Sequence, residues 1–557
     1  MIWLTVTAPK LEFNSAPYRL SGVVYGCLLN HAPALASLGD AVHAAPYKAP
    51  PRAPVLYLKP RNTLAAEGQA VRVPAGSDAG PGAGQALQVG AALGLVIGQT
   101  ACKLTEADAL ACLAGVTIVN DLSMPHDSFY RPNVRLRARD GFCPISTRVV
   151  PLADLAAPVD ALGVRVFIDG VLVHSTTTGE RLRNAARLLA DVSEFMTLSP
   201  GDVLMLGVSA GAPLAYAGQL LRIEIDGLGS LNTPLVADGA AVRTALSLRP
   251  GPQQTPPQTG PETDLTADPQ PDPKTNPLAR PSLGPSPGPS PGPLSSQRSA
   301  RVAYSGALHT ATPHAPDASG TARLRLADGR ILGEHQVVWL PPFEVGTVIA
   351  LGLNYADHVK ELSKELTLSA QDEPLVFLKG PGALIGHRGH TRRPAGATYM
   401  HYECELAVVI GRTAHQVLAA DAMAHVAGYT VCNDYAVRDY LENWYRPNLR
   451  VKNRDGGTVL GPWFVPAAEV PDPHALALRT RVNGRVTQQG HTGQMIHRIP
   501  ALIEYLSAFM TLQAGDVILT GTPDGVVNVA LGDEVVCEID GIGSLYSTLA
   551  ADAEFGR

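Results

Sequence analysis

The sequence predicts an α+β protein, rich in β-strand, that is built from two tandem domains of the same fold. The first observation is an internal repeat: Asp-Gly-Leu-Gly-Ser-Leu at 226–231 returns as Asp-Gly-Ile-Gly-Ser-Leu at 540–545, an offset of 314 positions. Ser-Glu-Phe-Met-Thr-Leu at 193–198 returns at the same offset as Ser-Ala-Phe-Met-Thr-Leu at 507–512. So long a period indicates duplication of a whole domain, because solenoid repeats span only about 20–50 residues.

A linker between the two copies is the second observation. Residues 246–300 are rich in proline, glycine and serine and include Pro-Ser-Pro-Gly-Pro-Ser-Pro-Gly-Pro. With few large apolar side chains, this stretch cannot bury enough surface to offset the entropy of ordering, so we expect a semi-flexible tether. The predicted domains are therefore 1–245 and 301–557, and we expect them to pack together as an internal pseudo-dimer.

Short runs of β-branched residues bounded by glycine, proline or aspartate are the third observation, and they predict strands. These runs lie at 203–206, 220–225, 345–353, 406–410, 517–519 and 534–539. Helical spacing of apolar residues predicts helices at 355–366, 419–426 and 499–509. Helices scattered among short strands favour α+β domains over an open parallel sheet.

The composition narrows the class of protein. With 557 residues, 45% of them hydrophobic, the chain is too long for one core. A net charge of −6 does not favour nucleic acid or acidic membranes as partners. No apolar run reaches 18 residues, and the first residues lack the basic region of a signal peptide. Seven scattered cysteines without a Cys-x-x-Cys pair are typical of reduced thiols, so we expect a cytoplasmic protein.

Three acidic residues in the second copy suggest a metal site. Glu403 and Glu405 stand two positions apart before an apolar strand, so their side chains face the same way. Asp434 ends the next apolar run. Carboxylates without cysteine or imidazole partners suit a hard divalent cation, Mg²⁺ or Mn²⁺. Taken alone, a solvated pair of glutamates and a turn aspartate is the competing interpretation.

The first copy helps to decide between these interpretations. Val-Ile-Gly at 96–98 matches Val-Ile-Gly at 409–411, which sets Gly90 opposite Glu403 and Ala92 opposite Glu405. The strand is retained in both copies while the glutamates are not. Folding therefore does not require the glutamates, and this favours a functional role for them.

His358 and Glu361 form a second candidate pair. On a helix, residues three apart share one face. A carboxylate beside an imidazole orients the ring and raises its basicity, as general acid–base catalysis requires. An ordinary surface pair on a helix is the alternative.

Lysine and arginine residues supply candidates for binding an anion. Lys59 of the first copy matches Lys379, so Lys379 serves either the fold or substrate binding. Arg137 replaces Lys452, which makes Lys452 the better candidate for contact with an anionic substrate. A metal-free isomerase site around Asp121, Lys59 and Arg137 in the first copy stays an open alternative.

Several motifs together carry a family resemblance. They are Gly-Leu-Asn-Tyr-x-x-His-x-x-Glu at 352–361, Tyr-Glu-x-Glu-Leu at 402–406 and Gly-Tyr-Thr-Val-x-Asn-Asp at 428–434. With Gly-Thr-Pro at 521–523, they span most of 345–549, which resembles the fumarylacetoacetate hydrolase family. The resemblance implies a β-roll-like fold in each half and a cation held by Glu403, Glu405 and Asp434.

The resemblance also implies roles for other residues. His358 and Glu361 would lie on a mobile segment that closes over the substrate, with Lys452 near the metal. The residues implied for substrate binding are Lys379, Arg438 and Thr522. Some relatives carry glutamine three residues after the arginine, where this chain has Leu441, so that amide contact is not expected here.

The activity implied is metal-dependent chemistry on a 2-oxo acid with two or three carboxylates. It comprises decarboxylation of 5-oxopent-3-ene-1,2,5-tricarboxylate and isomerisation of 2-hydroxyhepta-2,4-diene-1,7-dioate, of the 5-carboxymethyl-2-hydroxymuconate delta-isomerase type, in aromatic catabolism. One alternative is C–C hydrolysis of an acylpyruvate or fumarylacetoacetate, and another is a non-catalytic binding or scaffold protein. A serine nucleophile at Ser209, within Gly-x-Ser-x-Gly, is a weak third, because the matching loop at 521–525 has no serine. Self-association beyond the internal pair is left open.

Overall fold

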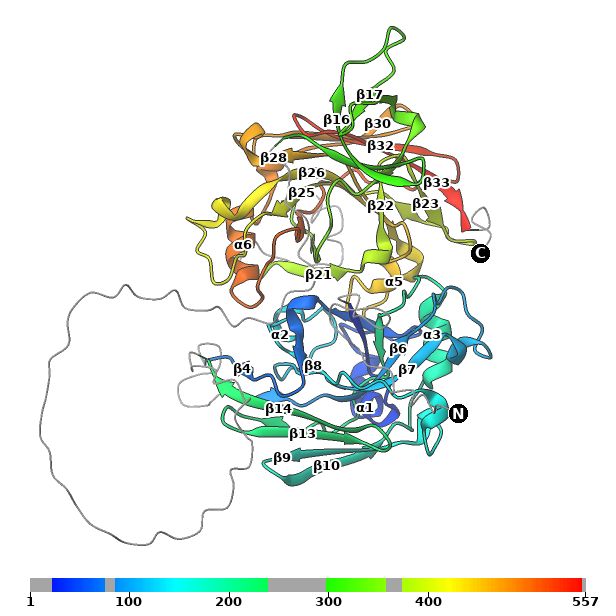
Figure 1. Ribbon diagram of the computed structural model, residues 1–557, viewed down its shortest axis with the longest axis vertical. Coiled ribbons are helices and arrows are strands. Elements are labelled where there is room, and N and C mark those ends of the chain that lie inside the picture. Colours follow the sequence, from blue (N-terminus) through cyan, green and yellow to red (C-terminus); the bar gives the residue numbers. More distant parts are fainter. Residues whose placement is uncertain (1–22, 76–85, 239–296, 357–372, 553–557) are drawn as a thin grey trace, which may run out of the picture.

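The computed structural model describes residues 23–75, 86–238, 297–356 and 373–552. Figure 1 shows two halves, one above the other, with the first half of the chain below. Within those ranges, no helix combines the length and the apolar character that crossing a membrane would demand.

Each half contains a seven-stranded sheet, and the strand order is the same in both. In the first half the order is β2 (Val55–Lys59), β1 (Val24–Leu28), β11 (Val203–Met205), β6 (Ala91–Ile97), β7 (Leu113–Asn120), β8 (Cys143–Ile145) and β3 (Leu64–Ala66). In the second half it is β21 (Leu375–Lys379), β20 (Val348–Gly352), β31 (Val517–Leu519), β25 (Cys404–Ile410), β26 (Val426–Asp434), β28 (Thr458–Pro466) and β22 (Leu384–Gly386). The shared order confirms the predicted duplication of a strand-rich domain.

Smaller sheets complete each half. In the first half they comprise β10 (Val171–Thr177), β9 (Gly163–Ile168), β13 (Leu220–Ile225), β14 (Gly229–Ala237) and β4 (Val71–Val73), with the pair β12 (Leu214–Ala215) and β5 (Leu87–Gln88). In the second half they comprise β23 (Gly389–Arg393), β33 (Gly543–Ala551), β32 (Glu534–Ile539), β29 (Ala477–Val482) and β30 (Arg485–His491), with the pair β24 (Met400–His401) and β27 (Ala436–Val437).

The second half carries one further five-stranded sheet, at the outer end of the molecule (Figure 1). Its strands are β18 (Ile331–Gly333), β17 (Arg323–Leu326), β16 (Ala307–His314), β15 (Ala300–Tyr304) and β19 (Val338–Leu340). Because β15 begins at Ala300, this sheet is the first structure after the predicted linker. Most of that linker lies outside the described residues.

Helices are short. Those within the described ranges are α1 (Ala32–Ala36), α2 (Val134–Arg137), α3 (Ala185–Ser193), α5 (Leu449–Lys452) and α6 (Ile499–Ser507). The predicted helix at 499–509 is confirmed as α6, with Pro500 in its first turn, where a missing N–H costs nothing. The helix predicted at 419–426 is wrong: a single 3₁₀ turn (Ala422–His425) leads directly into β26 at Val426, too short a stretch to repay helix nucleation. The helix predicted at 355–366 lies mostly outside the described residues.

The predicted strands are confirmed with small changes at their ends. The runs at 220–225, 517–519 and 534–539 are β13, β31 and β32, and 203–206 shortens to β11. The run at 345–353 narrows to β20, while that at 406–410 begins two residues earlier, as β25. Glu405 therefore lies inside a strand whose seven residues are all buried, and it is the one charged residue there. Burying a charge in such a strand is costly unless it is compensated.

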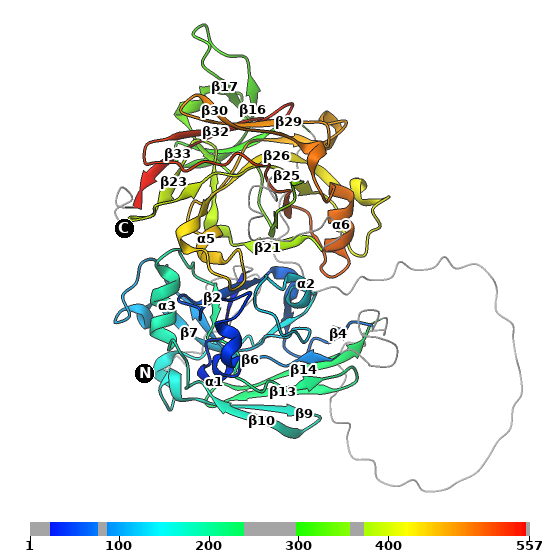
Figure 2. The same ribbon diagram turned by 180° about the vertical axis from the view of Figure 1, so that it is seen from behind.

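The two halves meet through equivalent elements. The short helix α5 of the second half contacts β2 of the first, and α2 of the first contacts β21 of the second. Figures 1 and 2 both place α5 and β21 at the base of the upper half, against the lower half. Reciprocal contacts of this kind define a pseudo-two-fold relationship between the halves, as predicted.

Candidate metal centre and its surroundings

Glu403, Glu405 and Asp434 converge in the second half. Each offers a carboxylate oxygen, and these oxygens all lie within 4.8 Å of one another. The convergence follows from antiparallel pairing of β25 with β26, in which Cys404 faces Asn433 and the backbone N–H of Asp434 donates to the carbonyl of Glu403 (2.9 Å). Within the described parts of the chain, this is the one acidic, histidine or cysteine group close enough to hold a metal ion.

The electrostatics of this group fit a cation. All three residues are buried, and burial, then Asp434 and Glu403, raise the pKa of Glu405 well above its usual value. The backbone N–H of Gly521 donates to Oε2 of Glu405 (2.6 Å), which compensates only part of its charge. Three buried oxygen donors that repel one another match the hard ligand set that Mg²⁺ and Mn²⁺ prefer.

Two lysines approach the carboxylates. The ammonium of Lys379 donates to Oδ1 of Asp434 (2.5 Å) and to the backbone carbonyl of Lys452. The ammonium of Lys452 donates to Oε2 of Glu403 (2.5 Å) and to Oδ2 of Asp434 (3.1 Å). Burial lowers the pKa of Lys452, but Asp434 and Glu403 outweigh it and hold that pKa above its usual value. Lys379 is therefore tied to the acidic group, and Lys452 is a fixed positive charge beside it.

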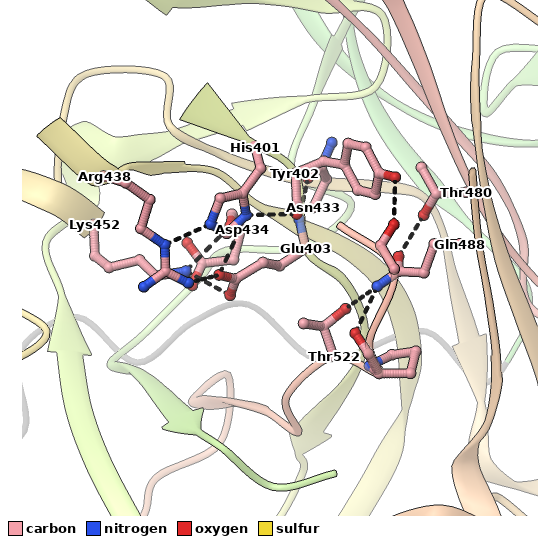
Figure 3. A network of polar contacts seen from close by, with 12 residues as sticks. His401, Tyr402, Glu403, Asn433, Asp434, Arg438, Lys452, Thr480, Gln488 and Thr522 are labelled. Atoms are coloured by element: carbon pink, nitrogen blue, oxygen red, sulfur yellow. Dashed lines mark hydrogen bonds and ion pairs between the residues drawn. The ribbon is translucent and has the colours of Figure 1, made fainter. Parts of the chain in front are cut away.

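Arg438 reaches the same group through a histidine. Its Nε donates to Nε2 of His401 (2.6 Å), and its Nη2 lies 3.7 Å from Oε1 of Glu403 (Figure 3). Burial, with Arg438 as the next cause, lowers the pKa of His401 to about 3, so this imidazole is neutral. Since Nε2 accepts from Arg438, the ring proton resides on Nδ1, which lies 3.0 Å from the carbonyl of Tyr402. The neutral His401 thus orients Arg438 toward Glu403.

Thr522 belongs to a second polar group. Figure 3 shows this group on the side of Glu403 and Asp434 opposite to Arg438 and Lys452. Nε2 of Gln488 donates to Oγ1 of Thr522 (2.9 Å) and to the carbonyl of Pro523 (2.8 Å). Thr480 in turn donates to Oε1 of Gln488 (2.8 Å). Because Oγ1 of Thr522 accepts from Gln488, its own hydroxyl proton is not used by that contact.

The first half has a different arrangement at the equivalent place. The backbone N–H of Asp121 donates to the carbonyl of Gly90 (2.8 Å), as Asp434 does to Glu403. A Cβ at Gly90 would lie 2.2 Å from the carbonyl oxygen of Asp121, so no side chain fits there. Lys59 (2.9 Å) and Arg137 (3.0 Å) pair with the Asp121 carboxylate. At this place the first half therefore has one carboxylate, that of Asp121, and it is paired with Lys59 and Arg137.

Ser209 lacks the setting of a hydrolase nucleophile. Its loop runs from β11 to the short strand β12, without the strand-to-helix turn that such a serine requires. The hydroxyl oxygen accepts from Nη2 of Arg181 (3.2 Å), while Nδ1 of His31 accepts from the backbone N–H of Ala210. The histidine nitrogen is thus engaged with backbone.

Sequence reasoning did not single out His401 or Gln488. His401 precedes Glu403 by two positions, so strand alternation could have placed both on one face. Gln488 comes from β30, far along the chain, and carries no local signal. His358 and Glu361 lie outside the described residues.

Comparison with known proteins agrees with the duplicated architecture. The family model described as fumarylacetoacetate (FAA) hydrolase C-terminal matches residues 23–236 and again 347–550. The chain belongs to the fumarylacetoacetate hydrolase family. Both halves are members of this family, and only the second carries the acidic triad of Glu403, Glu405 and Asp434 among the described residues.

Relatives within the family match nearly the whole chain. The 4-hydroxyphenylacetate degradation bifunctional isomerase/decarboxylase of Salmonella dublin is 37% identical over 533 residues, which cover 96% of this chain and 99% of the relative. The protein of the same name from Escherichia coli is 38% identical, with the same shares covered.

A solved structure matches one half of the chain. It is that of 5-carboxymethyl-2-hydroxymuconate delta-isomerase from Mycobacterium smegmatis, which is 37% identical, covers 46% of this chain and 99% of its own, and has a TM-score of 0.40.

Proposed function

We propose that this protein is a divalent-metal-dependent enzyme that decarboxylates 5-oxopent-3-ene-1,2,5-tricarboxylate and isomerises 2-hydroxyhepta-2,4-diene-1,7-dioate. Relatives 37% and 38% identical over 96% of the chain bear the name of a bifunctional isomerase/decarboxylase of 4-hydroxyphenylacetate degradation. The observation that carries the proposal is the buried acidic triad with two lysines beside it. We place the enzyme in the cytoplasm, because its scattered cysteines are typical of a reducing compartment.

Glu403, Glu405 and Asp434 would hold Mg²⁺ or Mn²⁺. When bound, such an ion supplies Lewis-acid stabilisation for the negative charge that develops on the keto oxygen of a 2-oxo acid. Lys452 and Arg438 provide fixed positive charge on one side of the triad and attract the substrate's carboxylates. The hydroxyl of Thr522, oriented by Gln488, would donate to a carboxylate on the other side.

His358 and Glu361 are proposed, from the sequence, to transfer the proton that converts the dienol into the enone. An imidazole with a neighbouring carboxylate can hold and release a proton near neutral pH. Lys379 is proposed to hold the Asp434 carboxylate in place, because its ammonium donates to Oδ1 of that residue.

The direct test is turnover with defined substrates. The purified protein should consume the tricarboxylate and the dienol only when Mg²⁺ or Mn²⁺ is present, and Glu403→Ala should abolish both activities. An acylpyruvate assayed in parallel separates C–C hydrolysis from decarboxylation. Turnover of the acylpyruvate alone would replace the proposal with a hydrolase, and turnover of the tricarboxylate in chelator would refute the metal site.

A further inference from the structure

The first half of the chain contacts residues 444–455 of the second half on both sides of Lys452. At the start of this segment, the indole of Trp444 stacks on Tyr47, with ring centroids 4.1 Å apart and planes at 10°. Nε1 of Trp444 also donates to the carbonyl of Ala49 (2.9 Å). Because Trp444 stacks on one residue of the first half and donates to another, its orientation is fixed where the chain approaches α5.

Backbone hydrogen bonds also join the two halves at the next two residues, Tyr445 and Arg446. The N–H of Tyr445 donates to the carbonyl of Phe129 (2.8 Å), and that of Arg446 to the carbonyl of Tyr130 (2.7 Å). These bonds resemble a short stretch of ladder between the two halves. The residues before α5 therefore have little freedom to shift.

A second anchor lies just beyond α5. The backbone N–H of Thr197 donates to Oδ1 of Asp455 (2.8 Å), and its hydroxyl donates to Oδ2 of the same carboxylate (2.5 Å). Thr197 belongs to the first half, so these two hydrogen bonds cross the interface. Asp455 follows Lys452 by three residues. Hydrogen bonds to an ionised carboxylate are among the stronger ones.

Lys452 lies between the two anchors, on the last residue of α5. Its side chain is 6% exposed, and its ammonium contacts both Glu403 and Asp434. A helix of four residues has little stability of its own, so its position depends on what holds its ends. The location of the Lys452 ammonium thus depends on contacts made by the other half of the protein.

We propose that Thr197 is a positioning residue for Lys452, so that the site in the second half is complete only when the first half clamps residues 444–455. This gives the first half a task in catalysis although it lacks the glutamates. The inference rests on the proposed function for its activity readout and goes beyond it by assigning a role to a residue outside the site.

The pseudo-two-fold supplies a matched control. The backbone N–H of Thr511, the counterpart of Thr197, donates to Oδ1 of Asp140 (2.8 Å), and its hydroxyl donates to Oδ2. Asp140 follows Arg137 by three residues, as Asp455 follows Lys452. The same bond therefore clamps the helix of the first half, away from the acidic triad.

The experiment compares Thr197→Val, Thr197→Ser and Thr511→Val in the full-length protein. Losing one hydrogen bond to a carboxylate at the same interface should lower the melting temperature equally in the two valine variants. We expect kcat/KM for the tricarboxylate to fall about tenfold in Thr197→Val, to stay within about twofold of wild type in Thr511→Val, and to recover in Thr197→Ser. Equal losses in the two valine variants, or an unchanged Thr197→Val, would overturn the proposal.

Hydrogen exchange separates this proposal from the proposed function. If the wild-type protein does not turn over the tricarboxylate, the proposed function is refuted. Amide hydrogen exchange then tests the positioning role of Thr197 by itself. Faster exchange of the amides of 449–455 in Thr197→Val, and not in Thr511→Val, supports the clamp. Unchanged protection of these amides in Thr197→Val contradicts it.

Discussion

The ammonium of Lys452 and the carboxylate of Glu403 form a buried ion pair, with Nζ 2.5 Å from Oε2. Both residues belong to the proposed active site, and the lysine contacts two of the three carboxylates that would ligate a cation. A bound cation and this ammonium therefore compete for negative charge.

Lys452→Met should bind Mn²⁺ more tightly than wild type while losing activity. Removing a positive charge next to the ligands should raise Mn²⁺ affinity by roughly tenfold, whereas kcat/KM should fall by about 100-fold as substrate charge goes uncompensated. Titration calorimetry with Mn²⁺ and steady-state kinetics measure the two effects. Arg137→Met, the equivalent change in the first half, is the control and should leave Mn²⁺ affinity unchanged. Weaker Mn²⁺ binding by Lys452→Met would contradict this account.

Glu405→Gln should preserve the stability of the metal-free protein and remove the stabilisation by added metal. Burial, Asp434 and Glu403 already disfavour the charged form of Glu405 and raise its pKa, so a neutral amide of the same shape costs the metal-free fold nothing. The amide oxygen can still accept from the N–H of Gly521. We expect a melting temperature equal to or above that of metal-free wild type, and no rise in melting temperature when Mg²⁺ or Mn²⁺ is added. A wild-type response to the metal would remove Glu405 from the ligand set.

The ion cluster of the first half should give an acid-sensitive contribution to stability. Burial alone would raise the pKa of Asp121, but Lys59 and Arg137 outweigh it and hold the pKa below its usual value. Because the folded-state pKa is the lower one, the stabilisation is fully present above about pH 4, the unfolded value, and is lost as the pH falls through the folded value. Asp121→Asn should therefore cost about 3–5 kcal/mol at pH 7, because it removes the carboxylate that pairs with the buried side chains of Lys59 and Arg137.

Thermal unfolding between pH 3 and 7, in roughly half-unit steps, tests that sign. The difference between wild type and Asp121→Asn should be largest near neutrality and shrink in acid. Asp434→Asn, the counterpart in the second half, gives a comparison at the same position of the fold. A difference that grows toward low pH would mean that the cluster does not stabilise the folded state.

Thr522→Val should affect substrate binding more than the chemical step. Gln488 leaves the hydroxyl proton of Thr522 available, and a carboxylate of the substrate is the acceptor proposed for it. Losing one hydrogen bond to a charged group costs about 1.5–3 kcal/mol, so KM should rise about tenfold or more with kcat within about twofold. Thr522→Ser retains the hydroxyl and should behave as wild type. A fall in kcat at constant KM would assign Thr522 to the transition state instead.

Much of the architecture could be read from local patterns. Strands such as 517–519 and 534–539 were predicted with their observed bounds, because β-branched runs between turn residues specify extended backbone. The helix predicted at 419–426 is wrong, since apolar spacing over so few residues does not distinguish a helix from a turn that leads into a strand. His401 and Gln488 were missed because their importance lies in their partners, Arg438 and Thr522, which are distant in sequence.

The sequence by itself determined that a domain is duplicated and that Glu403 and Glu405 face one way, since both follow from comparing segments and from the two-residue period of a strand. Only the tertiary structure decided that Lys379 and Lys452 meet at Asp434, because that depends on the order of strands in the sheet. The tertiary structure alone also set Thr197 against Asp455. These contacts join residues 18, 55 and 258 positions apart, and they depend on how preformed sheets pack, which no local sequence pattern records.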